Sequence, residues 1–151
     1  MPDGRFMRMA IDKAMEGIRG GQMPFGACIV RGEEAISCEH NTIIKERDVT
    51  AHAEINAIKG ACKKLDTLDL SECTIYCTCE PCPMCLGALS LANIKRVVYG
   101  ASIHDVDLEG YTVLDTPQGL FSVLGFIEVN AGFLMEENIK ILKEWEKRRI
   151  R

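Results

Sequence analysis

The sequence predicts an α/β fold of three layers, in which helices cover both faces of one sheet. Two observations support this prediction. Segments with the pattern of strands alternate with segments of helical apolar spacing, and 47% of the 151 residues are hydrophobic against 26% charged. This balance is typical of a globular domain, and the length is sufficient to bury a core. Neither an internal repeat nor a linker divides the chain, so we expect a single domain over residues 1–151.

The helices are predicted from apolar residues that recur every three to four positions. Gly20-Gly21 ends the first helix, and Thr50 is suited to the N-cap of the second. Pro83 is suited to the opening turn of the third, where its missing N–H has no helical acceptor to lose. The helices are expected over residues 6–18, 51–65, 82–92 and 134–147.

The strands are predicted from short runs rich in β-branched and apolar residues. The first two form a hairpin whose turn contains Gly32. Residues 102–120 are expected to be irregular, because Gly110, Pro117 and Gly119 interrupt any regular pattern. The strands are expected over residues 27–30, 35–38, 74–78, 96–101 and 126–130.

The charge of the chain favours a small-molecule substrate over a nucleic acid. The formal net charge is −4 and the isoelectric point is about 5.4, whereas dedicated nucleic-acid binders usually carry a basic excess. The basic cluster Lys147-Arg148-Arg149, with Arg151 beyond it, is interpreted as cations that complement a helix end. The sequence contains no apolar run of 18 residues, so no membrane span is predicted. Residues 1–8 lack the apolar core of a secretion signal. We therefore expect a cytoplasmic protein.

Two short motifs predict a zinc site. The first is His52-Ala53-Glu54, and the second places Cys82 and Cys85 in the pattern P-C-x-x-C. One imidazole and two thiolates make three ligands, one fewer than a closed structural zinc site uses, so the fourth position is free for water. A carboxylate two residues after the histidine can serve that water as a proton shuttle. The combination of H-x-E with P-C-x-x-C is the signature of zinc-dependent nucleobase deaminases.

The spacing of these residues gives the site a geometric basis. Cys82 and Cys85 are three positions apart at a predicted helix start, so both thiols face one side. His52 stands near the start of another predicted helix. Helix starts also favour thiolate over thiol, because their unpaired N–H groups and dipole stabilise negative charge. Two helix starts can thus hold one cation between them.

Other cysteines and histidines leave one alternative open. Cys77 and Cys79 precede the motif closely, so a four-thiolate structural site made with Cys82 and Cys85 is conceivable, but it would leave the H-x-E motif without a purpose. The remaining cysteines are expected to be buried structural residues rather than a disulfide framework: Cys28, Cys38, Cys62 and Cys73. Two isolated histidines, His40 and His104, are expected not to be ligands.

Four segments resemble the cytidine deaminase superfamily, closest to its guanine deaminase, nucleoside deaminase and bacterial tRNA-adenosine deaminase branches. They are Pro24–Ala27, His40-Asn41, Thr50–Glu54 and Cys79–Ala88. The resemblance runs from about residue 6 to residue 101. It implies a mixed five-stranded sheet flanked by helices, one Zn²⁺ per subunit and a homodimer.

The resemblance also implies roles for individual residues. The zinc ligands would be His52, Cys82 and Cys85, and Glu54 would be the catalytic proton shuttle. The three implied substrate contacts are Asn41, which would hydrogen-bond the base or ribose, Phe25, which would line the pocket, and Ala53, whose backbone N–H would contact a base carbonyl.

The substrate is predicted from the details of the motifs. The run from Cys79 to Cys85 resembles guanine and nucleoside deaminases, whereas the acidic residues expected of a guanine enzyme are replaced by Thr112, Val113 and Leu114. Residues 127–149 resemble the tRNA branch. We predict hydrolytic deamination of a free base or nucleoside of the guanine, guanosine or cytosine type, with ammonia release.

Two other functions stay open at this point. One is adenosine-to-inosine deamination in a tRNA anticodon loop, with the cluster at residues 147–149 as a phosphate contact. The other is a non-catalytic zinc-binding partner subunit. The second would be expected to lack the proton shuttle, so the presence of Glu54 argues against it.

Overall fold

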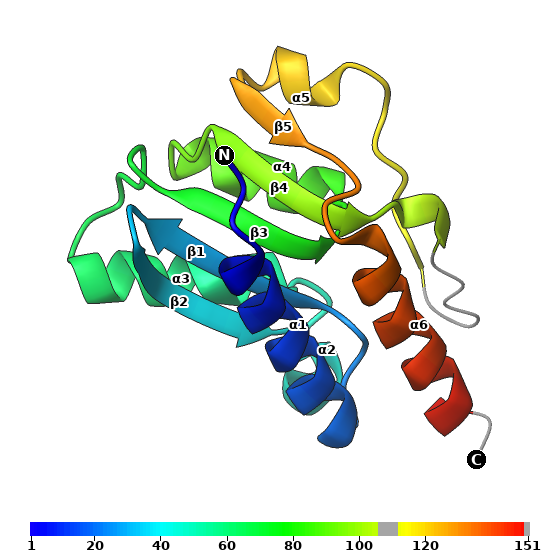
Figure 1. Ribbon diagram of the computed structural model, residues 1–151. Coiled ribbons are helices and arrows are strands. Elements are labelled where there is room, and N and C mark those ends of the chain that lie inside the picture. Colours follow the sequence, from blue (N-terminus) through cyan, green and yellow to red (C-terminus); the bar gives the residue numbers. More distant parts are fainter. Residues whose placement is uncertain (106–111, 150–151) are drawn as a thin grey trace.

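The computed structural model describes residues 1–105 and 112–149, and within them five strands form one sheet in the order β2-β1-β3-β4-β5 (Figure 1). β1 (Gly26–Arg31) pairs antiparallel with both β2 (Glu34–His40) and β3 (Thr74–Cys79). β4 (Arg96–Ala101) runs parallel to β3, and β5 (Glu128–Asn130) runs parallel to β4. The predicted α/β class and the mixed five-stranded sheet are confirmed.

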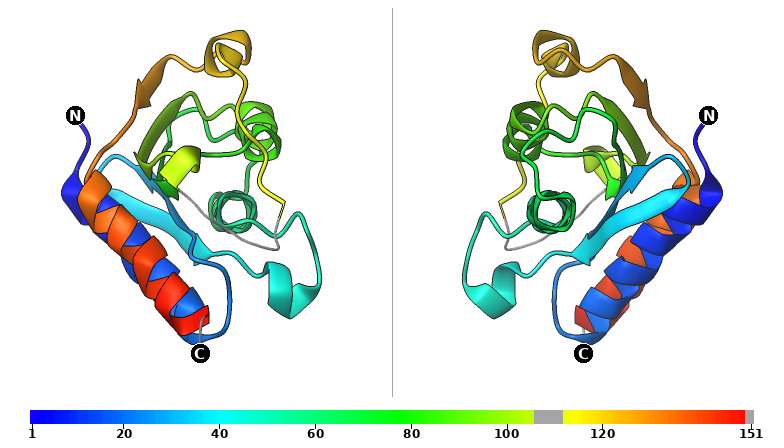
Figure 2. Two further views of the ribbon diagram at one scale, coloured as in Figure 1. Left: turned by 90° about the vertical axis from the view of Figure 1, so that its right-hand side faces the viewer. Right: turned by 90° about the vertical axis from the view of Figure 1, so that its left-hand side faces the viewer.

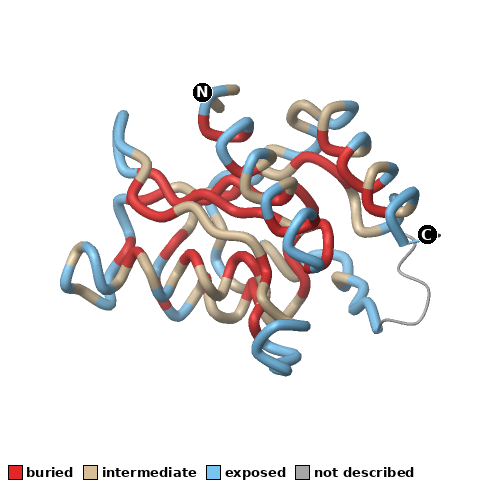
Figure 3. The backbone as a smooth tube through the Cα atoms, turned by 90° about the horizontal axis from the view of Figure 1, so that it is seen from below, coloured by how far each residue is buried: buried red, intermediate tan, exposed pale blue. Residues whose placement is uncertain are grey.

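Helices cover both faces of this sheet. On one face, α1 (Gly4–Arg19) and α6 (Met135–Arg149) lie side by side, and on the other lie α3 (Ala53–Leu65) and α4 (Pro83–Leu91), as Figure 2 shows. Between these layers, β1 and β3 are buried along almost their whole length, so the core lies at the centre of the sheet (Figure 3). The α/β/α layering is therefore the one that alternating strands and helices predict.

Close packing of α1 on the sheet depends on one glycine. A Cβ atom at Gly26 would lie 2.1 Å from the carbonyl oxygen of Ala10 in α1, which is closer than any side chain tolerates. Asp3 caps the helix by accepting the N–H of Arg5 at 2.9 Å, and α1 ends before Gly20. Because the helix sits this close, its apolar side chains Phe6, Met7 and Ala10 reach Cys28 and Tyr76 in the sheet.

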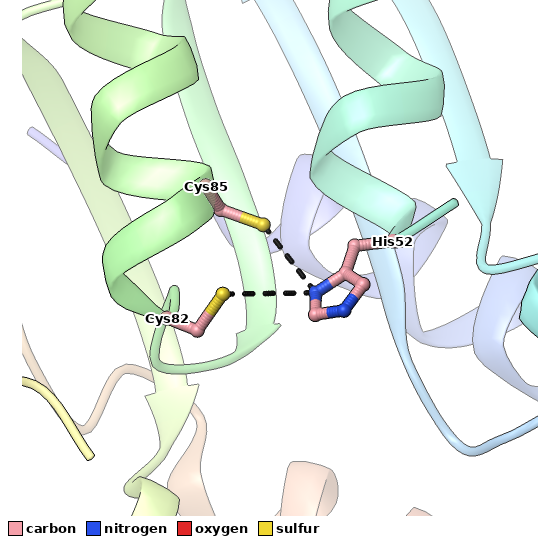
Figure 4. Close-up of side chains that lie close together, drawn as sticks. All are labelled: His52, Cys82 and Cys85. Carbon is pink, nitrogen blue, oxygen red and sulfur yellow. Dashed lines mark hydrogen bonds between the residues drawn. The ribbon is translucent and has the colours of Figure 1, made fainter. Parts of the chain in front are cut away.

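The topology brings the ends of several elements to one edge of the sheet. β3 and β4 are parallel, so their carboxyl ends lie at the same edge, and the chain leaves β3 directly into the start of α4. Ligands in open α/β folds bind outside the carboxyl ends of such strands. The start of α3 faces the same place, as Figure 4 shows from the residues at both helix starts.

Helix boundaries differ from prediction at both helix starts near this edge. Thr50 is not the N-cap of α3, because its N–H and hydroxyl both bond to the carboxylate of Asp48, at 2.8 and 2.6 Å. His52 holds the N-cap position instead, and Cys82 holds that of α4, with Pro83 as the first helical residue. Two of the three predicted ligands, His52 and Cys82, therefore stand just before their helices, and Cys85 lies in the first turn of α4.

Other segments are more regular than predicted. A short helix α2 (Ile43–Glu46) follows β2, and a 3₁₀ turn (Ile103–Asp105) lies in the segment 102–120 that was expected to be irregular. A further short helix, α5 (Leu120–Val123), begins where that segment ends. Of the residues named in the predictions, Gly110 and Arg151 lie outside the described part of the chain. Among the described residues, no helix is long and apolar enough to cross a bilayer.

One cysteine prediction is wrong. Cys28 of β1 and Cys38 of β2 lie directly opposite each other with Cα atoms 4.1 Å apart, and the structure joins them in a disulfide. The hairpin turn at Gly32 sets the register that brings them together, and a separation of ten residues in the sequence gives no sign of it. Cys62 and Cys73 are free thiols, the first half-buried and the second buried.

Candidate metal centre and its cavity

Three donor atoms meet between the starts of α3 and α4. The Nδ1 atom of His52 lies 3.7 Å from Sγ of Cys82 and 3.5 Å from Sγ of Cys85 (Figure 4). Among the described residues, this is the group of histidine, cysteine or acidic side chains whose donor atoms lie close enough together to hold a metal ion. The sequence predicted these residues, and the fold brings them together from positions 30 and 33 residues apart.

The donor spacing fits zinc. Zinc bonds of about 2.3 Å to sulfur and about 2.0 Å to nitrogen, at tetrahedral angles, separate the two ligand atoms by roughly 3.5 Å. Both nitrogen–sulfur distances are close to that value. A nitrogen and two sulfurs are also the soft donor set that zinc prefers over magnesium or calcium.

The two thiols share their protons unequally. The hydrogen bond from Cys85, helped by His52, lowers the pKa of Cys82 to about 4 although burial opposes the change. The neighbouring Cys82 sulfur and burial raise the pKa of Cys85 far above its ordinary value. At neutral pH the metal-free pair therefore holds one thiolate and one thiol.

The His52 ring has a raised pKa. Burial favours its neutral form and is the largest single effect, but the hydrogen bond to Cys82 and the nearby Glu54 carboxylate together outweigh it. A positive metal ion must therefore compete with protons for this nitrogen as well as for Cys85.

Glu54 is a buried carboxylate beside the donor atoms. Its side chain is only 7% exposed, and it lines the cavity next to His52. Burial raises its pKa, and the nearby His52 opposes that shift. A carboxyl group with a raised proton affinity is suited to take up and return a proton near neutral pH.

A cavity of about 410 Å³ opens over the metal donors and Glu54. Its volume is within the range of small-molecule sites. Most of its wall is apolar or aromatic and is made by Met23, Phe25, Ile43, Val49, Met84, Ile103, Val113 and Leu114. The described charged and titratable groups in the lining are His52, Glu54, Cys79, Glu80 and Cys82. The cavity can therefore hold a flat apolar ring with a few polar contacts at the donor end.

Asn41 lies fully buried in the cavity wall. Its side-chain amide donates to the carbonyl of Met23, and its backbone N–H donates to the carbonyl of Phe25 at 3.3 Å. Its Oδ1 atom is buried without a hydrogen-bond partner in the structure. A buried unpaired acceptor is costly, and a donor group on a bound ligand would remove that cost.

Phe25 and Ala53 also lie in the wall. Phe25 packs against core residues on both sides of the sheet edge, which fixes its ring at the cavity margin. Ala53 is the first residue of α3, where a backbone N–H has no acceptor within its own helix. All seven residues predicted for the site therefore lie at one place.

Four other cysteine and histidine residues considered in the sequence do not join the metal donors. Cys77 is buried inside β3, and Cys79 lines the cavity but directs its thiol to the carbonyl of Ser102 at 3.8 Å, so neither belongs to the donor group. His40 bonds through Nδ1 to the Asn41 carbonyl oxygen at 2.7 Å, and His104 is exposed. The four-thiolate alternative therefore has no support in the fold.

The outer wall was not predicted. Residues 112–114 complete the cavity, and Thr116 holds this strap (residues 112–116) against the ligand loop by donating its hydroxyl to the carbonyl of Pro81 at 3.1 Å. Asp115 lies 3.6 Å from His104. The sequence analysis noted Thr112, Val113 and Leu114 only as replacements for the acidic residues expected of a guanine enzyme, which does not reveal a contact with the metal loop.

Comparison with known proteins identifies similar chains. The family described as "Cytidine and deoxycytidylate deaminase zinc-binding region" matches residues 1–101. Guanine deaminase of Bacillus subtilis is 43% identical over 107 residues, which are 70% of this chain and 69% of that protein. The tRNA-specific adenosine deaminase of Haemophilus influenzae is 35% identical over 151 residues, covering 97% of this chain and 85% of that one. A solved guanine deaminase from Nitrosomonas europaea has a TM-score of 0.88 at 27% identity, over 97% of this chain and 85% of its own.

Proposed function

We propose that this chain, which belongs to the cytidine and deoxycytidylate deaminase family of zinc proteins, hydrolytically deaminates a free nucleobase or nucleoside of the guanine, guanosine or cytosine type. The observation that carries the proposal is the cavity itself. It offers an apolar slot above the donors, and its described lining contains carboxylates but no lysine or arginine. A polyanionic RNA would need cations there, whereas an uncharged ring would not.

The reaction exchanges an amino group for a carbonyl: the substrate amine and one water give the oxo product and ammonia. Zinc held by His52, Cys82 and Cys85 would supply polarised water, whose pKa falls toward ~7 when zinc binds it. Glu54 takes the proton from water, delivers it to a ring nitrogen, and assists the departure of ammonia. Its burial beside His52 supports this role, because bulk water cannot compete for the proton.

The substrate is oriented by the opposite wall. The free Oδ1 of Asn41 accepts an N–H or O–H from the base or ribose, and the N–H of Ala53 donates to a base carbonyl. Phe25 packs against the ring. These contacts hold the amino-bearing carbon near Glu54 and the donor atoms, which is where proximity and orientation lower the barrier.

A tRNA anticodon loop is the second candidate substrate. It is favoured by the tRNA-specific relative, whose similarity covers 97% of this chain, against 70% for the guanine deaminase relative. In that case the exposed cations Lys147 and Arg148 would contact phosphates. They are not part of the cavity lining. The partner-subunit alternative has less support, because Glu54 is present and buried in the cavity.

The test is a substrate panel scored by ammonia release. It contains guanine, guanosine, cytosine, cytidine, adenine, adenosine and an anticodon stem-loop RNA. We expect turnover of at least one free base or nucleoside, and none of the RNA. Turnover of the RNA alone would overturn the small-molecule proposal, and no ammonia from any compound by the zinc-loaded protein would support the partner-subunit alternative.

We also propose that the protein is a cytoplasmic homodimer. Exposed apolar side chains gather where α4 ends and at α5 and β5, among them Leu91, Val123 and Ile127. Exposed apolar groups of this size are typical of interaction surfaces. Sedimentation analysis is expected to give a dimer that Val123→Lys weakens, and a monomer for the unaltered protein would contradict the proposal.

A further inference from the structure

We propose that Asn56 of α3 is a positioning residue for the substrate: it fixes Asn41 at a set distance from the metal donors without touching the substrate itself. The inference rests on the proposed function and deepens it. Asn56 lies one helical turn after His52, and its backbone N–H donates to the His52 carbonyl at 3.0 Å. Its position is therefore tied directly to a metal ligand.

The side chain of Asn56 donates hydrogen bonds to both sequence neighbours of Asn41. Its Nδ2 atom donates to the carbonyl of His40 at 3.1 Å and to the hydroxyl oxygen of Thr42 at 3.0 Å. A carbonyl oxygen can only accept, so the side-chain amide must present its NH₂ group in this direction. One side chain thus spans the two residues that flank the predicted substrate contact.

Thr42 extends this chain of hydrogen bonds, with each donor and acceptor assigned consistently. Its hydroxyl accepts from Asn56 and donates in turn to the carboxylate of Glu46. Its backbone N–H donates to the carbonyl of Ala51 at 2.9 Å, immediately before His52. Residues 40–42 are therefore tied to α3 and to the loop that leads into it, and both ties end within one turn of the metal ligand.

Asn41 itself has little freedom left. Its backbone N–H, its carbonyl and its side-chain NH₂ are bonded to Phe25, the His40 ring and Met23 respectively. Only the buried Oδ1 atom is unpaired, and Asn41 lines the cavity. Because misplacing a contact by about 1 Å can cost as much as about 10²-fold in rate, the tie from α3 to this segment sets how well substrate is held.

The test is a double-mutant cycle of Asn56→Ala with Asn41→Ala, measured on the panel compound that the wild-type protein turns over fastest. Alone, Asn56→Ala is expected to raise KM about tenfold, with a smaller change in kcat and full zinc content. In the Asn41→Ala background the same change is expected to alter KM less than about twofold, because the group that Asn56 positions is gone. Asn56→Asp keeps the shape but loses the donor to His40, so it should not rescue binding.

Asn138→Ala is the matched control. Like Asn56, Asn138 donates two hydrogen bonds from Nδ2, here to the carbonyls of Phe133 at 3.2 Å and Leu134 at 2.9 Å. It is buried and lies on α6, on the opposite face of the sheet. It should lower the melting temperature about as much as Asn56→Ala and leave KM unchanged. The inference would be overturned if the KM effects of Asn56→Ala and Asn41→Ala simply multiply in the double variant. An equal KM increase in Asn138→Ala would also overturn it. If the RNA proves to be the substrate, the cycle runs on the RNA, so a failure of the small-molecule proposal does not obscure this result.

Discussion

The metal donors and the strap over them come from two parts of the chain that differ in their relation to known deaminases. The donors and Glu54 lie within residues 1–101, the part that the family shares. The strap, residues 112–116, lies beyond that part and closes the cavity from outside. We propose that the two parts have separate tasks: the first would carry the chemistry, and the second would shape what can enter the cavity. Changes in the first should abolish turnover, and changes in the second should redistribute it among substrates.

The largest effect is expected from a metal ligand. Cys85→Ser replaces a thiolate with a hydroxyl that binds zinc poorly, so zinc is expected to be lost and turnover to fall by more than about 10³-fold. Metal analysis and ammonia release measure the two effects. Cys79→Ser is the matched control: its thiol lines the same cavity but lies outside the donor group, so zinc should be retained. The reverse pattern would reassign the ligands.

Glu54→Gln is expected to separate chemistry from metal binding. The amide has the same shape as the carboxyl group but cannot take up a proton, so turnover should fall about 10²- to 10⁴-fold. Zinc content and melting temperature should stay close to those of the wild-type protein, because Glu54 is not one of the three donors. Retained ammonia release would remove Glu54 from the mechanism.

Zinc affinity is expected to fall as pH falls. At neutral pH Cys82, with its pKa lowered to about 4, is already a thiolate. The Cys85 thiol and a fraction of the His52 imidazoles still carry protons, because the pKa values of both groups are raised. Zinc must displace those protons, so binding releases them and acidification opposes it. Calorimetry in buffers of different ionisation enthalpy measures the release. Binding enthalpies that do not depend on the buffer would contradict this assignment of protonation.

Local patterns in the sequence were sufficient to predict the metal donors. The donors were predicted because H-x-E and P-C-x-x-C are short motifs at helix starts, and β4 was predicted with its observed bounds because its apolar run is continuous. The start of α3 was misplaced because Asp48 competes for Thr50, a choice that depends on one loop conformation. Here prediction failed by only a few residues.

Contacts that depend on packing and register, and that no motif marks, could not be predicted. The disulfide between Cys28 and Cys38 depends on strand register, and the tie from Asn56 to His40 depends on how α3 packs beside β2. The strap reaches Pro81 across 35 residues through a single hydroxyl. Each of these results from packing, which leaves no periodic or motif-like trace in the sequence.

A moderate effect is expected from the strap. Thr116→Val keeps the volume of the side chain but removes the hydrogen bond to Pro81, which is worth about 1 kcal/mol and corresponds to roughly a fivefold change in KM. Leu114→Ala widens the cavity mouth, so it should raise kcat/KM for the larger nucleosides relative to that for free bases. Kinetics across the panel measure both. If turnover of every substrate falls equally and zinc is lost as well, the strap stabilises the metal centre and does not discriminate among substrates.

The smallest effect is expected at the basic end of α6. Lys147→Gln with Arg148→Gln removes two exposed cations, and the Arg148 pair with Glu144 lies on the surface, so stability should change little. Turnover of a free base should not change, because neither residue lines the cavity. Binding of the anticodon stem-loop, measured at several salt concentrations, distinguishes the two substrate classes. If these residues contact phosphates, affinity falls and its salt dependence weakens by about one contact for each cation removed. If RNA binding is equally weak before and after the change, α6 contributes packing but no recognition of RNA, and selection is left to the cavity and its strap.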